Sequence, residues 1–157
     1  MGDKRYPYGA LRREMQLHML VKAQELLDQR LIRGIGENGT EYAVLSAVLG
    51  LPKEITRLIQ AFDFAKRNPK LVCVHTEERE GTLEDAILLT FLSLVGFDAV
   101  IFTPTGYQSI ERFLTARHPV EHQVGPYRFG VQMPDLSSLP PVKKGLQWVS
   151  NLLKRGF

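Results

Sequence analysis

The sequence lacks the features of a disulfide-stabilised or membrane-spanning protein. It contains a single cysteine, Cys73, so no disulfide can form within the chain, and the apolar run around it favours a buried thiol. Every apolar run breaks well short of the ~20 residues that a membrane-spanning helix requires. The first residues lack the apolar segment of a secretory signal. We therefore expect a cytoplasmic protein that is not an integral membrane protein.

Common signatures of catalysis and of metal or nucleotide binding are also absent. The sequence has no Cys-x-x-Cys pair, no Gly-x-Ser-x-Gly elbow and no Walker phosphate-binding loop. Gly34, Gly36 and Gly39 follow a helical pattern rather than a strand, which favours turn glycines. His118 and His122 are separated by Pro119, which argues against a helical metal-binding pair. The residues therefore leave open whether the chain catalyses any reaction.

Size and composition favour one folded domain. The chain has 157 residues, of which 44% are hydrophobic and 24% charged, so it can bury a core of its own. We interpret residues 1–157 as a single domain and residues 134–157 as a linker followed by an amphipathic tail. In that tail, the pattern of residues 143–155 predicts a short helix. Its apolar residues, which lie on or near one side, are Leu146, Val149, Leu152 and Leu153.

Charge is distributed unevenly along the chain. Residues 70–111 contain two Lys or Arg against seven Asp or Glu, which is a net charge of −5. Residues 112–157 contain seven against two, which is a net charge of +5. Two interpretations stay open: charges scattered over solvated faces, or an acidic site in the middle and a basic tail.

Hydrophobic periodicity predicts helices in the first half of the chain and an alternating strand–helix pattern in the second. Helices are expected over 9–31, from an N-terminal cap at Thr40 to about Val48, and over 52–66. Apolar runs at 71–74 and 97–102 predict strands buried on both faces, joined by a helix over 83–95 that Thr82 caps with Asp85. A further helix is expected over 108–116, and two weak strands over 120–124 and 127–131.

This order defines the expected fold class. Strand, helix, strand and helix in succession form a βαβα core, which requires parallel strands and a right-handed crossover. We therefore predict an α/β protein with a small, mainly parallel sheet, a helical N-terminal segment and a short C-terminal helix.

Two loops at the ends of the predicted strands are the candidate binding site. Ligands of open parallel sheets bind beyond the carboxyl ends of the strands. The loop after the second strand contributes Thr103, Thr105, Gly106 and Tyr107. The hydroxyls of Thr103 and Thr105 can donate hydrogen bonds to a ligand, and Gly106 lets the backbone approach the ligand closely. The N-terminus of the helix expected to follow would attract an anion. The alternative is that Thr105 and Gly106 form only a turn and a cap.

The loop after the first strand is acidic. It contains His75, Glu77, Glu78 and Glu80. Carboxylates in such a cluster can act as acid and base or hold Mg²⁺, and the spacing selects neither role. The carboxylates after Thr82 can equally serve only the helix start.

Other functional classes have weaker support. The segment LSAVLGLPKEITRLI suggests a helix-turn-helix, but Ser46 and Thr56 fit its pattern imperfectly, which argues against nucleic-acid binding. The basic tail could contact an anionic membrane surface, although packing or a partner contact is favoured. A non-catalytic module whose acidic and basic surfaces dock other proteins is the main alternative to ligand binding.

The run from EEREGTLEDAILL through GFDAVIFTPTGYQSIE resembles the bacterial YceG-like family found beside TerD-type tellurium-resistance genes. RYPYGALRREMQ and KKGLQWVSNLLKRGF resemble it less strongly. The resemblance implies a C-terminal domain of a longer protein, acting in a cytoplasmic tellurium, toxic-anion or stress-resistance system. It also implies other proteins of a resistance operon as partners, and it implies no catalytic residue. With the two loops, it leads us to expect a domain that binds a nucleotide or sugar phosphate.

Overall fold

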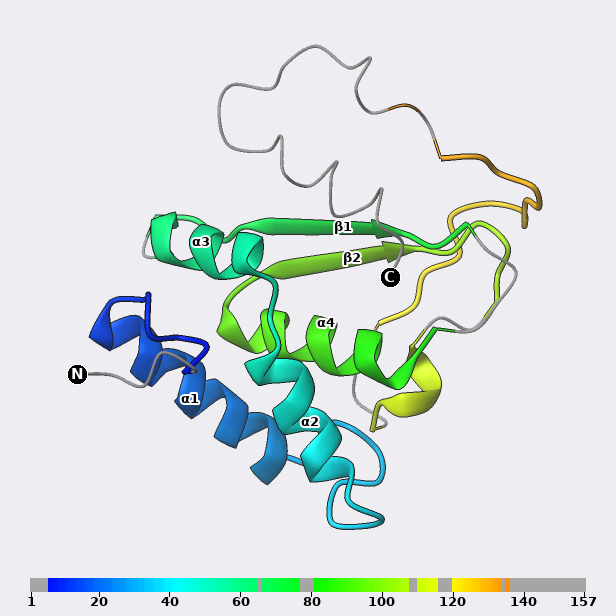
Figure 1. Ribbon diagram of the computed structural model, residues 1–157. Helices are drawn as coiled ribbons and strands as arrows, with labels where there is room; N and C mark the ends of the chain where they lie inside the picture. The colour runs from blue at the N-terminus through cyan, green and yellow to red at the C-terminus, as the bar shows by residue number, and fades with distance from the viewer. Residues whose placement is uncertain are drawn as a thin grey trace.

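A computed structural model describes residues 6–64, 66–76, 81–107, 110–115, 120–133 and 135. Three helices come first, and a strand–helix–strand unit follows them (Figure 1). The elements are α1 (Arg13–Asp28), α2 (Thr40–Leu49), α3 (Lys53–Ala61), β1 (Lys70–Val74), α4 (Leu83–Val95), β2 (Asp98–Phe102) and the 3₁₀ helix η1 (Glu111–Phe113). This small α/β fold confirms the predicted fold class.

The two strands pair in parallel along their whole length. Lys70 is opposite Asp98 and Val74 is opposite Phe102, without a bulge between them. Parallel neighbours need a crossover connection, and α4 supplies it. The predicted parallel pairing is therefore confirmed, and both strands end at the same edge of the sheet.

Local sequence fixes both ends of the crossover helix α4. The Asp85 N–H donates to Thr82 Oγ1 at 3.1 Å, and the Thr82 N–H donates to the Asp85 carboxylate at 2.9 Å. This reciprocal pair is the capping box that the sequence predicts, with Asp in the place of Glu or Gln. Gly96 ends the helix at a φ of 122°, a backbone conformation that residues with a side chain rarely adopt.

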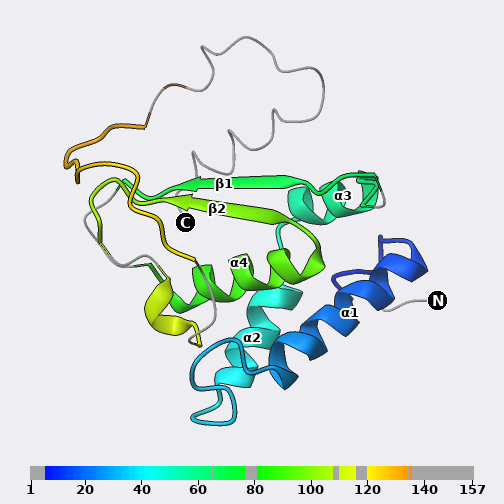
Figure 2. The ribbon, with the colours of Figure 1, turned by 180° about the vertical axis from the view of Figure 1, so that it is seen from behind.

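Helix α4 lies between two layers. One side faces the sheet, and α1 and α2 pack against the other, as Figures 1 and 2 show from opposite directions. Its composition suits this position, because nearly all of its residues are apolar and Ala86, Ile87, Phe91, Leu92 and Val95 are buried. The main core therefore forms around α4, with Met19 and Leu26 from α1 and Val44 and Val48 from α2.

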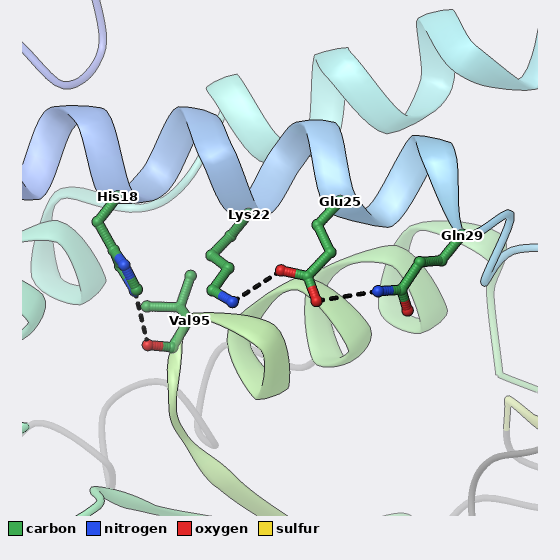
Figure 3. A network of polar contacts seen from close by, with 5 residues as sticks. All are labelled: His18, Lys22, Glu25, Gln29 and Val95. Atoms are coloured by element: carbon green, nitrogen blue, oxygen red, sulfur yellow. Dashed lines mark hydrogen bonds and ion pairs between the residues drawn. The ribbon is translucent and has the colours of Figure 1, made fainter.

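A polar contact also joins α1 to the end of α4, beside others along α1 itself (Figure 3). The His18 Nε2 donates to the carbonyl of Val95 at 3.0 Å, which satisfies one of the last carbonyls of the helix. One turn further along α1, Glu25 accepts from Lys22 at 2.7 Å and from Gln29 at 3.0 Å. The His18–Val95 contact therefore joins the two helices, whereas the contacts of Glu25 lie within α1 and its C-terminal cap.

A short bridge connects the segment after α1 to the segment after β2. Ile32 and Leu114 pair in antiparallel fashion, with the Arg33 N–H donating to Phe113 at 2.7 Å and the Thr115 N–H donating to Leu31 at 3.0 Å. The helical N-terminal half is thus tied to the end of the β2 segment by backbone hydrogen bonds.

The prediction that both faces of the strands are buried is wrong. Leu71, Cys73 and Ile101 belong to or pack against the core on the α4 side. On the opposite side, Val72, Val100 and Phe102 are 42%, 48% and 47% exposed. A two-stranded sheet with one crossover helix has only one covered face, and an apolar run alone does not reveal the number of layers.

Several predicted boundaries also need correction. The helix expected over 108–116 contains only η1 among its described residues, and residues 120–133 form no strand. The helix expected over 9–31 begins at Arg13, and that expected over 52–66 ends at Ala61. Thr40 is the first helical residue of α2 rather than its cap, because Gly39 precedes it with a φ of 74°. The expected helix over 143–155 lies outside the described residues, as does all of the 134–157 segment except Asp135.

Among the residues that the structure describes, no helix is long and apolar enough to cross a bilayer.

We predict that Tyr8→Phe lowers the free energy of unfolding by about 1 kcal/mol. The buried Tyr8 hydroxyl donates to the Val48 carbonyl at 2.6 Å and so ties the N-terminal segment to α2. Denaturant unfolding of the full chain measures the change. Tyr42→Phe is the matched control, because Tyr42 is 79% exposed and should show no loss. Equal stability of Tyr8→Phe and the parent chain would contradict the prediction.

We predict slow alkylation of Cys73 in the folded protein. Burial, aided by the Asp85 carboxylate, raises the pKa of this thiol to about 11. Its ordinary value is 9.0, so at pH 8 the reactive thiolate should be about 100-fold rarer than in the unfolded chain. Iodoacetamide labelling with and without urea tests this, and equal rates would refute it. Because folding raises the pKa of Cys73, ionisation of this thiol lowers the stability of the fold only when the pH rises above 9.0, the pKa of the thiol in the unfolded chain.

Candidate functional site

The candidate site lies at the edge of the sheet where both strands end. We call it the carboxyl edge and define it as His75, Thr76 and residues 103–107. The N–H of His75 donates to the carbonyl of Phe102 at 2.8 Å, which extends the pairing one step beyond the strands. His75 and Thr103 therefore leave the sheet side by side, as parallel pairing of β1 and β2 requires.

The loop 103–107 is a tight turn. The Gly106 N–H donates to the Thr103 carbonyl at 3.1 Å, and the Tyr107 N–H donates to Thr105 Oγ1 at 3.3 Å. Thr105 is the one buried polar residue among the described side chains, with 4% exposure. Gly106 has a φ of 71°, which favours glycine. The turn interpretation of Thr105 and Gly106 is thus supported, and the Thr105 hydroxyl remains able to donate through its own proton.

Among the described residues, the loop 103–107 lacks the helix dipole that was expected to attract an anion. The loop was expected to open an α-helix, but only the three-residue η1 follows among the described residues. A helix this short has too few aligned peptide dipoles to form an anion site. The amides of Gly106 and Tyr107 are also already used within the turn. Attraction for an anion must therefore come from side chains rather than from a helix N-terminus.

A later segment brings two unexpected residues to the carboxyl edge. The Arg128 N–H donates to the carbonyl of Pro104 at 2.8 Å. The ring of Tyr127 lies against Gly106, where an added Cβ atom would clash with it. In Figure 1 this stretch passes beside the ends of the strands. The close approach that Gly106 permits is therefore used by Tyr127, and it places the basic residue Arg128 next to the loop.

Two buried polar side-chain atoms have no hydrogen-bond partner within the described part of the chain. They are His75 Nδ1 and Glu111 Oε2. Leaving such an atom unpaired costs about 1–3 kcal/mol, so native proteins rarely leave it unpaired. His75 was a predicted site residue and is at the carboxyl edge, whereas Glu111 was not singled out and lies in η1.

The structure does not describe the predicted acidic half of the site. Glu77, Glu78 and Glu80 lie outside the described residues. Among the residues that are described, no group of three His, Cys, Asp or Glu side chains lies close enough to hold a metal ion. The hypothesis of a bound Mg²⁺ therefore depends on the carboxylates of residues 77–80.

Sequence reasoning found one part of this site and missed another. Parallel pairing places His75 beside Thr103, and Thr105, Gly106 and Tyr107 follow Thr103 in the same loop; their role in binding a ligand stays a prediction. Tyr127 and Arg128 were missed, because the pattern of residues 127–131 was interpreted as a strand. Their placement depends on one backbone hydrogen bond and on a ring against a glycine, which leave no periodic signal in the sequence.

Fold and site together define a small α/β domain with a candidate ligand site at the carboxyl edge of a two-stranded parallel sheet. Residues 3–132 match the family model of the YceG domain, so the chain belongs to that family. The "Uncharacterized protein YceG" of Bacillus subtilis (strain 168) is 48% identical over 65 residues. These are 41% of this chain and only 12% of that relative. No solved structure matches the chain.

We predict that Gly106→Ala destabilises the protein by about 1–2 kcal/mol, the cost of placing a residue with a Cβ in a left-handed conformation. The new methyl group should also displace the Tyr127 ring. Thermal unfolding and the NMR signals of the Tyr127 ring measure the two effects. Gly125→Ala is the matched control, because nothing lies within 4 Å of the added methyl group. Equal behaviour of the two variants would show that the Tyr127 contact does not constrain the loop.

Proposed function

We propose that the chain is a binding domain for an anionic small molecule, a nucleotide or a sugar phosphate, which occupies the carboxyl edge. Following the family resemblance, we propose further that the longer protein works in a cytoplasmic tellurium, toxic-anion or stress-resistance system, alongside other proteins of a resistance operon. The proposal concerns binding and does not assign a reaction.

The observation that carries this proposal is the unpaired Nδ1 of His75. This atom is buried at the edge where both strands end, and within the described residues nothing bonds to it. The neighbouring loop contributes the Thr103 and Thr105 hydroxyls. A phosphoryl oxygen would accept a hydrogen bond from a protonated Nδ1, and the loss of stability from the unpaired atom would then be recovered.

Charge supports an anionic ligand. Arg128 is exposed, and its backbone is held at Pro104. A guanidinium can bind a phosphate through two parallel hydrogen bonds. The carboxylates Glu77, Glu78 and Glu80 follow His75 in sequence and would reach such a ligand through Mg²⁺, which bridges carboxylate and phosphate oxygens.

The test is an NMR titration of the full chain with inorganic phosphate and with ADP, each with and without Mg²⁺. We expect the largest shifts at residues 75–76, 103–107 and 128. Arg128→Gln should weaken binding about 10- to 100-fold, since a hydrogen bond to a charged group contributes about 1.5–3 kcal/mol. His75→Leu should also weaken binding without loss of stability, because it removes an unpaired buried atom.

Arg57→Gln is the matched control for charge alone. Arg57 is exposed on α3, which lies near the other end of the strands (Figure 1). It should leave the affinity unchanged. Shifts confined to other surfaces, or equal affinity in all three variants, would refute ligand binding at the carboxyl edge.

A non-catalytic interaction module is the second candidate, and a specific observation favours it. Leu17, Leu20 and Val21 are exposed on α1, and Leu45 and Leu49 are exposed on α2, a helix that contacts α1. Contiguous apolar residues at a surface often mark protein–protein contacts. A failed titration at the carboxyl edge would favour this reading, since the longer relative has other parts that could cover α1 and α2.

A further inference from the structure

One face of the sheet is apolar and uncovered. We call it the outer sheet face and define it by the side chains that alternate away from α4: Lys70, Val72, Val74, Asp98, Val100 and Phe102. Lys70 and Asp98 form an ion pair at one end, and hydrogen bonds from Lys70 and Asn68 lower the pKa of Asp98. The other four side chains are apolar, and Val72, Val100 and Phe102 are exposed.

Such a face is unusual for parallel strands. Parallel sheets occur almost entirely in proteins where helices cover both faces, because each crossover helix packs on one of them. Here α4 covers the inner face, and no described helix packs on the outer one (Figures 1 and 2). The missing element is a second amphipathic helix.

We propose that residues 143–155 of the same chain form a helix that packs on the outer sheet face. This segment lies outside the described residues, and its sequence predicts a helix with one apolar stripe. The stripe contains Leu146, Val149, Leu152 and Leu153. Its four apolar side chains match in number the four on the outer sheet face, and the helix would give the sheet a cover on both faces.

Dimensions agree with this occupant. A helix of residues 143–155 would be about 20 Å long. Strands of five residues such as β1 and β2 span about 17 Å. A single pass of the helix along the strands would therefore cover Val72, Val100 and Phe102 together.

The connection is also long enough. Arg128 is held at the carboxyl edge by its bond to Pro104. Residues 129–142 follow it and can span roughly 50 Å when extended, about three times the length of the strands. The helix would start near the carboxyl edge and return toward Lys70 and Asp98, in the direction opposite to the strands, as α4 does on the inner face.

Trp148, the only tryptophan of the chain, reports on this contact. It borders the apolar stripe, one helical turn before Leu152. Acrylamide quenching of its fluorescence should be weaker in the full chain than in free tryptophan amide, and independent of protein concentration. Val100→Asp on the sheet and Val149→Asp in the tail should each raise quenching to the level of free tryptophan amide.

Val21→Asp is the matched control, since Val21 is a similarly exposed valine on α1. It should leave the quenching as in the parent chain. If Val100→Asp unfolds the domain, as circular dichroism would show, the milder Phe102→Ala replaces it, and Val149→Asp tests the tail without touching the core. Full quenching in the parent chain, or unchanged quenching in the sheet and tail variants, overturns the proposal. Protection that grows with protein concentration also overturns it, because a second copy would then be the occupant.

Discussion

The pairing of β1 with β2 is the constraint on which the rest of this structure depends. Two parallel strands cannot be joined by a tight turn, so the chain must leave the sheet, cross it and return. Helix α4 makes that crossing, and its apolar composition then requires cover on the side away from the sheet. Helices α1 and α2 supply it, with buried Met19 and Val48 packed in the core around Phe91. One pairing thus determines where the N-terminal helices must lie.

The same pairing positions the carboxyl edge and the outer sheet face, the two surfaces for which we propose a role. In-register strands end together, so His75 and Thr103 emerge side by side and make the carboxyl edge a shared site. Because only one crossover helix is present among the described elements, the opposite face of the sheet stays apolar and exposed. The proposed ligand at the edge and the proposed helix on the outer face therefore rest on separate features of the sheet, which has two strands and one covered side among the described residues.

Most residues of the candidate site could be predicted from local sequence, whereas the groups proposed to bind an anion, the buried Nδ1 of His75 and the side chain of Arg128, could not. The residues after each strand could be identified from two apolar runs and the helix between them. The capping box at Thr82 and Asp85 was equally visible, because it needs only two residues three apart. By contrast, only the 3₁₀ helix η1 follows the loop after β2 among the described residues, so the expected helix dipole is missing and the proposed binding of an anion rests on His75 and Arg128. Helix formation after Tyr107 depended on packing, which a short stretch of weak periodicity does not reveal.

The sequence by itself determined the order of the elements, the ends of α4, the parallel sheet and the membership of the Thr103–Tyr107 loop in the candidate site. The helix ends and the loop depend on side chains a few residues apart, and the parallel pairing follows from the order strand, helix, strand along the chain. Only the tertiary structure decided that the outer sheet face is exposed, that Tyr127 packs on Gly106, that Arg128 lies at Pro104 and that His75 Nδ1 is buried without a partner. Each of these depends on segments separated by 20 or more residues or on the number of layers around the sheet, and periodicity along one chain does not contain that information.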